Sequence, residues 1–451
     1  MDKTSADTIA AIATPPGKGG IGIVRVSGPQ VPSLIERYFG RPLPSRQAEL
    51  RPFRDRGGEI LDRGIAIFFE APHSYTGEHV LELQAHGGPV VLSLLLRYML
   101  ELGARPARPG EFTERAFLND KMDLAQAEAV IDLIDSSSEQ AARAAARSLQ
   151  GAFSHTVLQL KEKLIRLRMH IEAALDFPEE EIDFLADAEL AGRMRELQLQ
   201  LTEVSRSLRV GRLLKEGLSV LILGRPNAGK SSLLNRLAGR EAAIVTEIAG
   251  TTRDVLREHI HIEGVPLHII DTAGLRDSAD PVEREGVRRA WAEVEQADHV
   301  LLIVDDRTGV SPEEEKIIQA LPSDKPFDLI RNKIDLSGRE PFVETIDVQR
   351  KTLGLSAKTG AGIELLLAHL KQHIGAGQTL ENIVTARQRH IDAIAEVERH
   401  VSLAADQLKA RQGELAAEEL MLAQQTLGAI IGEFHSDDLL GEIFSSFCIG
   451  K

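Results

Sequence analysis

The sequence predicts a multidomain protein with an N-terminal α+β domain, an all-helical domain in two separate halves, and an α/β domain inserted between those halves. Three observations predict this class. The 451 residues are too many for one ordinary hydrophobic core. At about residue 120, short alternating apolar runs give way to helical spacing. Strand and helix patterns then alternate from about 216 to 375, after which helical spacing resumes.

Composition is that of a globular protein, with 43% hydrophobic and 27% charged residues. No signal peptide and no apolar run of about 18 residues is visible. Cys448 is the only cysteine, so no disulfide can form within the chain. Together these features predict a cytoplasmic protein that does not enter a membrane. The net charge of −15 argues against a protein that coats nucleic acid over its whole surface.

Residues 1–119 form the predicted α+β domain. Short β-like runs occur at 21–26 and 79–83, and apolar spacing predicts a helix over 90–102. The glycines of residues 17–22 satisfy G-x-G-x-x-G, but a strand follows them where a dinucleotide site needs a helix. We therefore interpret them as a tight turn.

Residues 120–215 and 376–451 form the two predicted halves of the helical domain. Apolar residues spaced by three and four predict long helices around 157–174 and 190–208, and Pro178 breaks the first of them. Because the same spacing returns after Gly377, insertion of residues 216–375 into one helical domain is the economical interpretation.

The inserted domain is organised around residues 218–232, LSVLILGRPNAGKSS. An apolar strand runs directly into Gly224–Ser231, which fits G-x-x-x-x-G-K-[ST], and helical spacing follows, as a phosphate-binding loop requires. The glycines let successive N–H groups face an anion. Lys230 can reach the β- and γ-phosphates, and the Ser231 hydroxyl can bind Mg²⁺.

Three later motifs select the nucleotide. Residues 271–274 (DTAG) end a strand as D-x-x-G, where the carboxylate can hold Mg²⁺ and the glycine lets an N–H approach the γ-phosphate. Residues 332–335 (NKID) end another strand as N-K-x-D, and Asp335 can accept two hydrogen bonds from guanine that adenine cannot supply together. Residues 356–358 (SAK) complete the base side. This order and spacing predict GTP.

The segment 246–254, TEIAGTTRD, is a predicted switch, because a threonine there can complete the Mg²⁺ shell and sense the γ-phosphate. Arg253 either stabilises transferred charge or is an ordinary surface arginine. Leu275 follows the D-x-x-G motif, where many small GTPases have a glutamine that orients water. Since leucine cannot polarise water, catalysis must use another group, such as Glu283, Glu285 or a monovalent cation.

The sequence resembles, over its whole length, the MnmE (also called TrmE) family of tRNA-modification GTPases. The matching motifs are long and specific to that family: ATPPGKGGIGIVRVSG, SYTGEHVLELQAHGG, RPGEFTERAFLNDKMDLAQAEAV, GRPNAGKSSLLN, TEIAGTTRDV, DTAGLRDS and SDDLLGEIFSSFCIGK. The resemblance implies a folate-binding-like fold in the N-terminal domain, a Ras-like P-loop GTPase fold in the inserted domain, and a homodimer.

The same resemblance implies a potassium-stimulated GTPase that works with an MnmG-type flavoprotein, which carries FAD, on uridine 34 of certain tRNAs. The product carries a carboxymethylaminomethyl or related aminomethyl group, with carbon from a 5-formyl- or 5,10-methylene-tetrahydrofolate. An RNA- or ribosome-assembly GTPase switch is the alternative, but no RNA-binding module is recognisable and the net charge is −15. A folate-dependent transferase with an idle GTPase domain is disfavoured by the full set of GTP motifs.

The resemblance also assigns roles to residues. It implies K⁺ at Asn227, Thr246, Ile248 and Thr251, Mg²⁺ at Ser231 and Thr252, and a folate at Arg25, Glu82, Lys121 and Lys451. It implies that Glu283 activates water through a bridging water, although Glu283 could instead cap the next helix; Lys230 and Arg253 are the other candidate catalytic residues. Cys448 is expected from sequence alone to be a small buried residue, and the family's C-terminus allows a role near the folate.

The complete set of expected GTP-binding residues is Asn227, Ala228, Gly229, Lys230, Ser231, Ser232, Thr246, Glu247, Ile248, Ala249, Gly250, Thr251, Thr252, Asp271, Thr272, Ala273, Gly274, Asn332, Lys333, Asp335, Ser356, Ala357 and Lys358.

Overall fold

A computed structural model describes residues 7–176, 188–238, 256–262, 265–271, 291–322, 325–347, 350–373, 383–433 and 437–450. The chain divides into two compact units. One unit lies within residues 1–131, 148–197 and 396–451, and the other lies within residues 132–147 and 198–395. In the part of the chain that the structure describes, no helix is long and apolar enough to cross a membrane.

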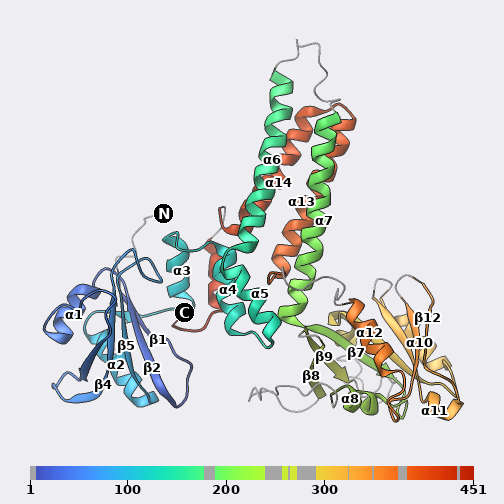
Figure 1. The fold of residues 1–451 in the computed structure, drawn as a ribbon, viewed down its shortest axis with the longest axis horizontal. Helices are drawn as coiled ribbons and strands as arrows, with labels where there is room; N and C mark the ends of the chain where they lie inside the picture. The colour runs from blue at the N-terminus through green and yellow to red at the C-terminus, as the bar shows by residue number, and fades with distance from the viewer. Residues whose placement is uncertain are drawn as a thin grey trace. The chain divides into compact units, whose positions relative to one another are not determined.

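The N-terminal domain is a six-stranded mixed sheet with the strand order β3-β4-β5-β2-β1-β6 (Figure 1). Its strands are β1 Ile9–Ile12, β2 Gly19–Ser27, β3 Glu49–Arg54, β4 Ile60–Phe69, β5 Val80–Gly87 and β6 Arg105–Pro106. Its helices are α1 Val31–Phe39, α2 Pro89–Glu101 and α3 Glu111–Leu118.

Helix α2 confirms the helix predicted over 90–102. Pro89 lies in its first turn, where the missing N–H is tolerated. Leu92, Leu95 and Met99 share one face at helical spacing and are buried in the core of the sheet. The tight turn expected over residues 17–22 is wrong for residues 19–22, because β2 begins at Gly19 and these residues pair with β5 through a register shift.

The helical part consists of α4 Leu124–Ile134, α5 Glu139–Leu149, α6 Ala152–Asp176, α7 Ala188–Glu216, α13 Gln388–Lys409, α14 Gly413–Ile431 and α15 Asp437–Ser445. Helix α6 ends at Asp176, just before the predicted break at Pro178. Its periodic apolar residues from Val157 to Ile171 are buried, and α6 packs against α14. Helices α7 and α13 each cross the border between the two compact units, so the predicted domain boundaries stay predictions.

The inserted α/β domain has a seven-stranded sheet with the order β12-β13-β11-β10-β7-β9-β8 (Figure 1). Its strands are β7 Leu218–Gly224, β8 Leu256–Ile262, β9 Val265–Asp271, β10 His299–Asp305, β11 Phe327–Asn332, β12 Phe342–Thr345 and β13 Lys351–Leu355. Its helices are α8 Lys230–Ala238, α10 Pro312–Ala320, α11 Ile334–Ser337 and α12 Ile363–His373.

The five central strands of this sheet are parallel, and their alternate residues enter two different cores. Val220 and Ile222 belong to one hydrophobic cluster, whereas Leu221 and Leu223 belong to another. Because both faces are covered, the interior positions of the central strands are apolar on both sides, as in residues 220–223 of β7 and 300–304 of β10. Polar motifs are therefore confined to the ends of the strands, and the carboxyl ends of β7, β10 and β11 meet at one edge.

Candidate functional site

The phosphate-binding loop joins β7 to α8, and its backbone requires both motif glycines. Gly224 has φ +145° and Gly229 has φ +102°, both in the region that favours glycine. A Cβ atom at Gly224 would lie 2.3 Å from the carbonyl oxygen of Ile303, and one at Gly229 would lie 2.1 Å from Nδ2 of Asn332. Asn227 between them is also left-handed, with φ +64°.

Helix α8 places the polar side chains of the loop. It begins at Lys230, whose Nζ donates to the carbonyl oxygens of Gly224 at 3.0 Å and Arg225 at 3.3 Å. Ser231 and Ser232 are exposed in its first turn, next to backbone N–H groups that can donate hydrogen bonds to an anion. The loop therefore combines an ammonium, hydroxyls and a helix N-terminus, which suits a phosphate with a bound cation.

Asn332 joins the phosphate loop to the base-side loop. Its Nδ2 donates to the carbonyl oxygen of Ala228 at 2.8 Å, and its Oδ1 accepts the N–H groups of Lys333 at 2.8 Å and Ala357 at 2.9 Å. The side chain is only 2% exposed. The buried amide thus makes three hydrogen bonds and holds three motifs together.

Lys333 makes a second connection to the phosphate loop. Its Nζ donates to the carbonyl oxygen of Asn227 at 2.6 Å and lies 2.9 Å from Oδ2 of Asp305. Lys333 itself has φ +69°, which turns the chain sharply at the end of β11 and leads into α11. Asp335 lies in the first turn of α11 and is exposed, so its carboxylate is accessible to a base.

The base-side loop after β13 is held from two directions. Ser356 and Ala357 are buried, and the Ser356 hydroxyl accepts the N–H of Thr359 at 3.2 Å. Arg236, on α8, donates to the carbonyl oxygens of Ala357 at 3.1 Å and of Lys358. The structure therefore brings together the expected residues 227–232, 332–335 and 356–358.

In the N-terminal domain, Arg25 and Glu82 face each other as register partners on β2 and β5. Nε and Nη2 of Arg25 both lie 3.0 Å from Oε1 of Glu82. The guanidinium lies 5.4 Å from the centre of the Tyr75 ring and 5.7 Å from that of Phe112, within cation–π range. Lys121 is exposed and donates instead to the carbonyl oxygen of Pro72 at 3.1 Å.

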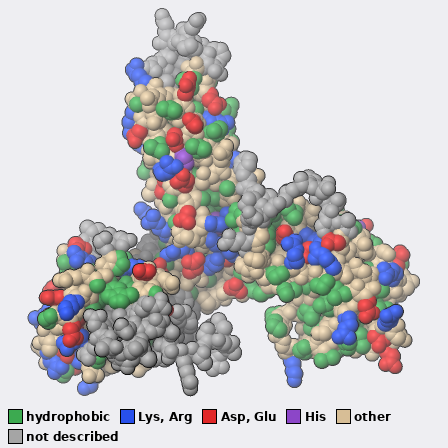
Figure 2. All heavy atoms as spheres, turned by 180° about the vertical axis from the view of Figure 1, so that it is seen from behind, with side chains coloured by type: hydrophobic (Ala, Val, Ile, Leu, Met, Phe, Trp, Pro, Cys, Tyr) green, Lys and Arg blue, Asp and Glu red, His purple; other side chains and the backbone are tan. Residues whose placement is uncertain are grey.

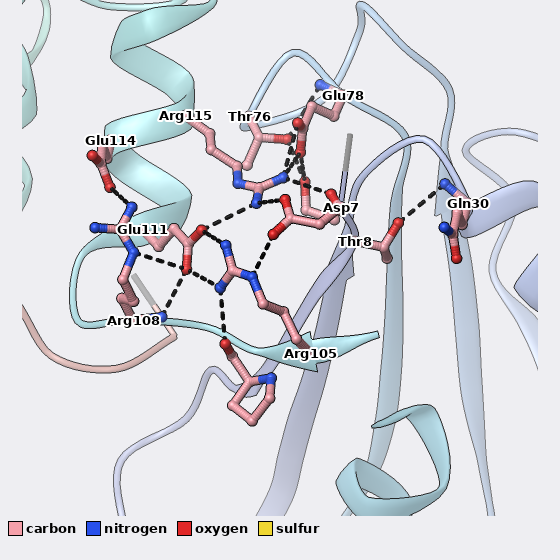
Figure 3. Close-up of polar contacts among 12 residues, drawn as sticks. Asp7, Thr8, Gln30, Thr76, Glu78, Arg105, Arg108, Glu111, Glu114 and Arg115 are labelled. Carbon is pink, nitrogen blue, oxygen red and sulfur yellow. Dashed lines mark hydrogen bonds and ion pairs between the residues drawn. The ribbon is translucent and has the colours of Figure 1, made fainter. Parts of the chain in front are cut away.

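A network of ion pairs around the buried side chains of Arg115 and Glu111 fixes α3 (Figure 3). The same helix carries Phe112. Arg115 lies 2.8 Å from Asp7, 3.0 Å from Glu78 and 3.0 Å from Glu111, and Arg105 pairs with the same Glu111. Burial alone would raise the pKa of Glu111, but hydrogen bonds from Arg105, the Arg108 N–H and Arg115 outweigh it and lower the pKa to about 2.

The C-terminal segment lies on this domain beside Arg25. Ile449 forms an antiparallel bridge with Pro109, and the Gly450 carbonyl oxygen lies 3.4 Å from Nη1 of Arg25. Cys448 is exposed, so the expectation of a buried cysteine is wrong. The preceding Phe447 is only 4% exposed and fills the apolar position of this turn, which directs the next side chain outward.

Comparisons with known proteins show what this chain is similar to. A family model described as the MnmE helical domain matches residues 124–448, and one described as the GTP-binding protein TrmE N-terminus matches residues 8–121. A tRNA modification GTPase MnmE from Proteus mirabilis is 57% identical over 99% of this chain and 100% of its own length. A tRNA modification GTPase MnmE from Hydrogenovibrio crunogenus is 55% identical over 100% of this chain and 100% of its own length.

The chain belongs to the MnmE family. Its fold is accordingly the N-terminal, helical and Ras-like GTPase domains of that family. A structure of Era from Aquifex aeolicus bound to GDP and AlF4⁻ is 26% identical over 40% of this chain and 66% of that chain, with a TM-score of 0.29.

Part of the site expected for an MnmE-family GTPase lies outside the described residues. These positions are Thr246, Glu247, Ile248, Ala249, Gly250, Thr251, Thr252, Arg253, Thr272, Ala273, Gly274, Leu275, Glu283, Glu285 and Lys451. Asp271 is the last residue of β9, and only its backbone is described. The roles expected of these residues stay predictions.

A cluster that MnmE-family motifs do not include lies at the opposite edge of the same sheet. Nε2 of His299, at the start of β10, lies 2.7 Å from Oδ2 of Asp328, and Nε2 of His369 contacts the same oxygen. All three side chains are buried. Ligands about 2.1 Å from one tetrahedral zinc ion would lie about 3.4 Å apart. The distances from the two histidine nitrogens to Oδ2 of Asp328 are shorter than that, and they are typical of hydrogen bonds.

The protons of this cluster can be assigned from its neighbours. Nζ of Lys351 lies 3.2 Å from Nδ1 of His369, and an ammonium can only donate, so His369 carries its proton on Nε2 and donates to Asp328. Burial alone would raise the pKa of Asp328, but hydrogen bonds from both histidines hold it below its ordinary value. The network joins β10, β11 and α12, and no local sequence pattern could reveal it.

Proposed function

We propose that this chain hydrolyses GTP and, together with an MnmG-type flavoprotein that carries FAD, modifies C5 of wobble uridine 34 in tRNA in the cytoplasm. The observation that carries the proposal is the bridging of three GTP motifs by the buried amide of Asn332. The full-length relatives named tRNA modification GTPase MnmE support the coupling to tRNA.

The residues of the phosphate loop suit GTP with two cations. Lys230 and the first turn of α8 would bind the β- and γ-phosphates, and Ser231, with Thr252, would hold Mg²⁺, which neutralises the phosphates. Asn227 is exposed in a left-handed turn and offers an amide oxygen for K⁺, with Thr246, Ile248 and Thr251. Asp335 would read guanine, while Glu283 would orient the attacking water.

A tetrahydrofolate derivative, either 5-formyl- or 5,10-methylene-, fits the pair of Arg25 and Glu82. Both bonds from Arg25 go to Oε1, and a carboxylate has about four acceptor positions, so Glu82 can also bind the amino-pyrimidine edge of a pterin. Tyr75 and Phe112 offer aromatic surface beside it. Lys121 and Lys451 would bind carboxylates of the same ligand, and the exposed Cys448 would lie nearby.

Homodimerisation is proposed through the N-terminal domain. Figure 2 shows hydrophobic side chains gathered on this domain. Leu50 and Ile65 are register partners on β3 and β4 and therefore share a face, on which they are 73% and 38% exposed. Exposed apolar patches of this kind mark interaction surfaces. Leu50→Asp should shift the mass measured by light scattering from dimer to monomer, whereas Leu336→Asp, at an exposed leucine of the inserted domain, should not.

Two measurements test the main proposal. GTP turnover by the purified full chain should rise when K⁺ replaces Na⁺, and equal rates would remove the cation from the proposal. Mass analysis of tRNA nucleosides from cells lacking the chain should show loss of the wobble aminomethyl groups. Restoration is expected with the unmodified gene and not with a Lys230→Ala variant. Intact nucleosides together with defective ribosome assembly would instead favour the assembly switch.

A further inference from the structure

The carboxylate at the end of β10 is not part of any GTP motif, yet it lies directly against one. Oδ2 of Asp305 is 2.9 Å from Nζ of Lys333 and 2.7 Å from Nη2 of Arg307. Oδ1 accepts the Arg307 N–H at 3.1 Å and its Nε at 3.0 Å. The hydrogen bonds from Arg307 and Lys333 keep the pKa of Asp305 well below its usual range, so it stays ionised at working pH.

The Lys333 ammonium lies between this carboxylate and the phosphate loop. On its other side it donates to the Asn227 carbonyl oxygen at 2.6 Å. Asn227 has φ +64°, in the left-handed region that residues other than glycine seldom adopt, although asparagine adopts it more readily than most. A left-handed residue in such a loop lets neighbouring N–H groups converge on an anion while its carbonyl points elsewhere. Lys333 is the group that satisfies this carbonyl.

We propose that Asp305 is a positioning residue for the nucleotide site: it holds the Lys333 ammonium against the Asn227 carbonyl and so keeps the phosphate loop in its anion-binding conformation. The inference rests on the proposed GTPase function. Arg307 acts indirectly, because its hydrogen bonds to Asp305 orient that carboxylate and do not reach the phosphate loop. The effects of substitution should therefore fall in the order Asp305, then Arg307.

Asp305→Asn is the direct test because it preserves shape and removes charge. An amide oxygen can still accept from Lys333, but the ion pair is lost. We expect the Kd for a fluorescent GDP analogue to rise about twofold to fivefold, as the loss of a partly exposed ion pair predicts. Half-saturation of GTP hydrolysis should move to higher K⁺ concentration, because the Asn227 side chain would be less well fixed. Asp305→Glu should restore both values in part, and Arg307→Gln should give a smaller change of the same sign.

Asp298→Asn is the matched control. Asp298 immediately precedes β10, at the opposite edge of the sheet, and it too accepts from an arginine and a backbone N–H: Arg212 at 2.9 Å and Ser219 at 2.9 Å. This variant should lower the denaturation midpoint reported by the single tryptophan, Trp291, without changing the Kd or the K⁺ midpoint.

Two results would overturn the inference. One is an Asp305→Asn variant whose Kd and K⁺ midpoint both lie within twofold of the unmodified chain. The other is an equal rise in the Kd and the K⁺ midpoint of Asp298→Asn, which would mean that both values depend on the general stability of the domain. Failure of the unmodified chain to bind GDP would overturn the proposed function and this inference with it, whereas normal binding by that chain isolates the role of Asp305.

Discussion

The amide of Asn332 offers the sharpest test of how the nucleotide site is assembled. Asn332→Ala removes the donor to Ala228 and the acceptor for the N–H groups of Lys333 and Ala357. At about 1 kcal/mol for each hydrogen bond, the loss is about 3 kcal/mol. If nucleotide binding has to restore the order lost from the two loops, this corresponds to an increase of about 150-fold in Kd.

The assay is a titration of the full chain with a fluorescent GDP analogue at fixed Mg²⁺ and K⁺. Asn235→Ala is the matched control, because Asn235 is an exposed asparagine on α8. It should bind GDP as the unmodified chain does. Asn332→Asp should also bind weakly, since a carboxylate cannot donate to the Ala228 carbonyl. An Asn332→Ala Kd within threefold of the unmodified value would refute the bridging argument.

Three further predictions use substitutions of acidic groups. Glu111→Gln should destabilise the N-terminal domain, whose three tyrosines report on it, by up to about 3 kcal/mol at pH 7. Because the pKa of Glu111 is lower in the folded chain than in the unfolded one, the difference in stability between Glu111→Gln and the unmodified chain should persist above pH 5. It should vanish as the pH falls towards 2, and a difference that grew in acid would contradict this prediction. Asp328→Asn should lower the unfolding midpoint reported by Trp291 at pH 7. Because the pKa of Asp328 is also lower in the folded chain than in the unfolded one, the difference in midpoint between the variant and the unmodified chain should narrow below about pH 4. Asp335→Asn should shift preference from guanine towards xanthine nucleotides, and retained GTP selectivity in competition binding would contradict the base-reading assignment.

Local patterns predicted the elements of the inserted domain closely. The apolar strand expected to run into the phosphate loop is β7, and the D-x-x-G and N-K-x-D motifs begin at the last residues of β9 and β11, as expected. These predictions succeed because apolar runs, glycines and strand ends are local features. The meeting of the motifs also follows from topology, since carboxyl ends of neighbouring parallel strands share one edge.

The contacts between distant segments could not be predicted in this way. Arg25 and Glu82 look like ordinary strand residues until the register of β2 and β5 places them opposite each other. The histidines around Asp328 lie 29 and 41 residues from it, so only the fold reveals their shared carboxylate. The expected burial of Cys448 failed for a related reason, because Phe447 has the larger apolar surface to bury and occupies the interior position.

The bond between Arg25 and the Gly450 carbonyl also has a consequence for biosynthesis. The two residues are 425 positions apart, and a Cβ atom at Gly450 would lie 2.4 Å from the carbonyl oxygen of Ile12, so the last residues fit tightly against the first strand. At about 5 to 20 residues per second, translation needs about 20 to 85 seconds to cover that interval. The carbonyl that accepts from Arg25 is therefore synthesised long after the strand that carries Arg25, so this hydrogen bond can form only late in synthesis.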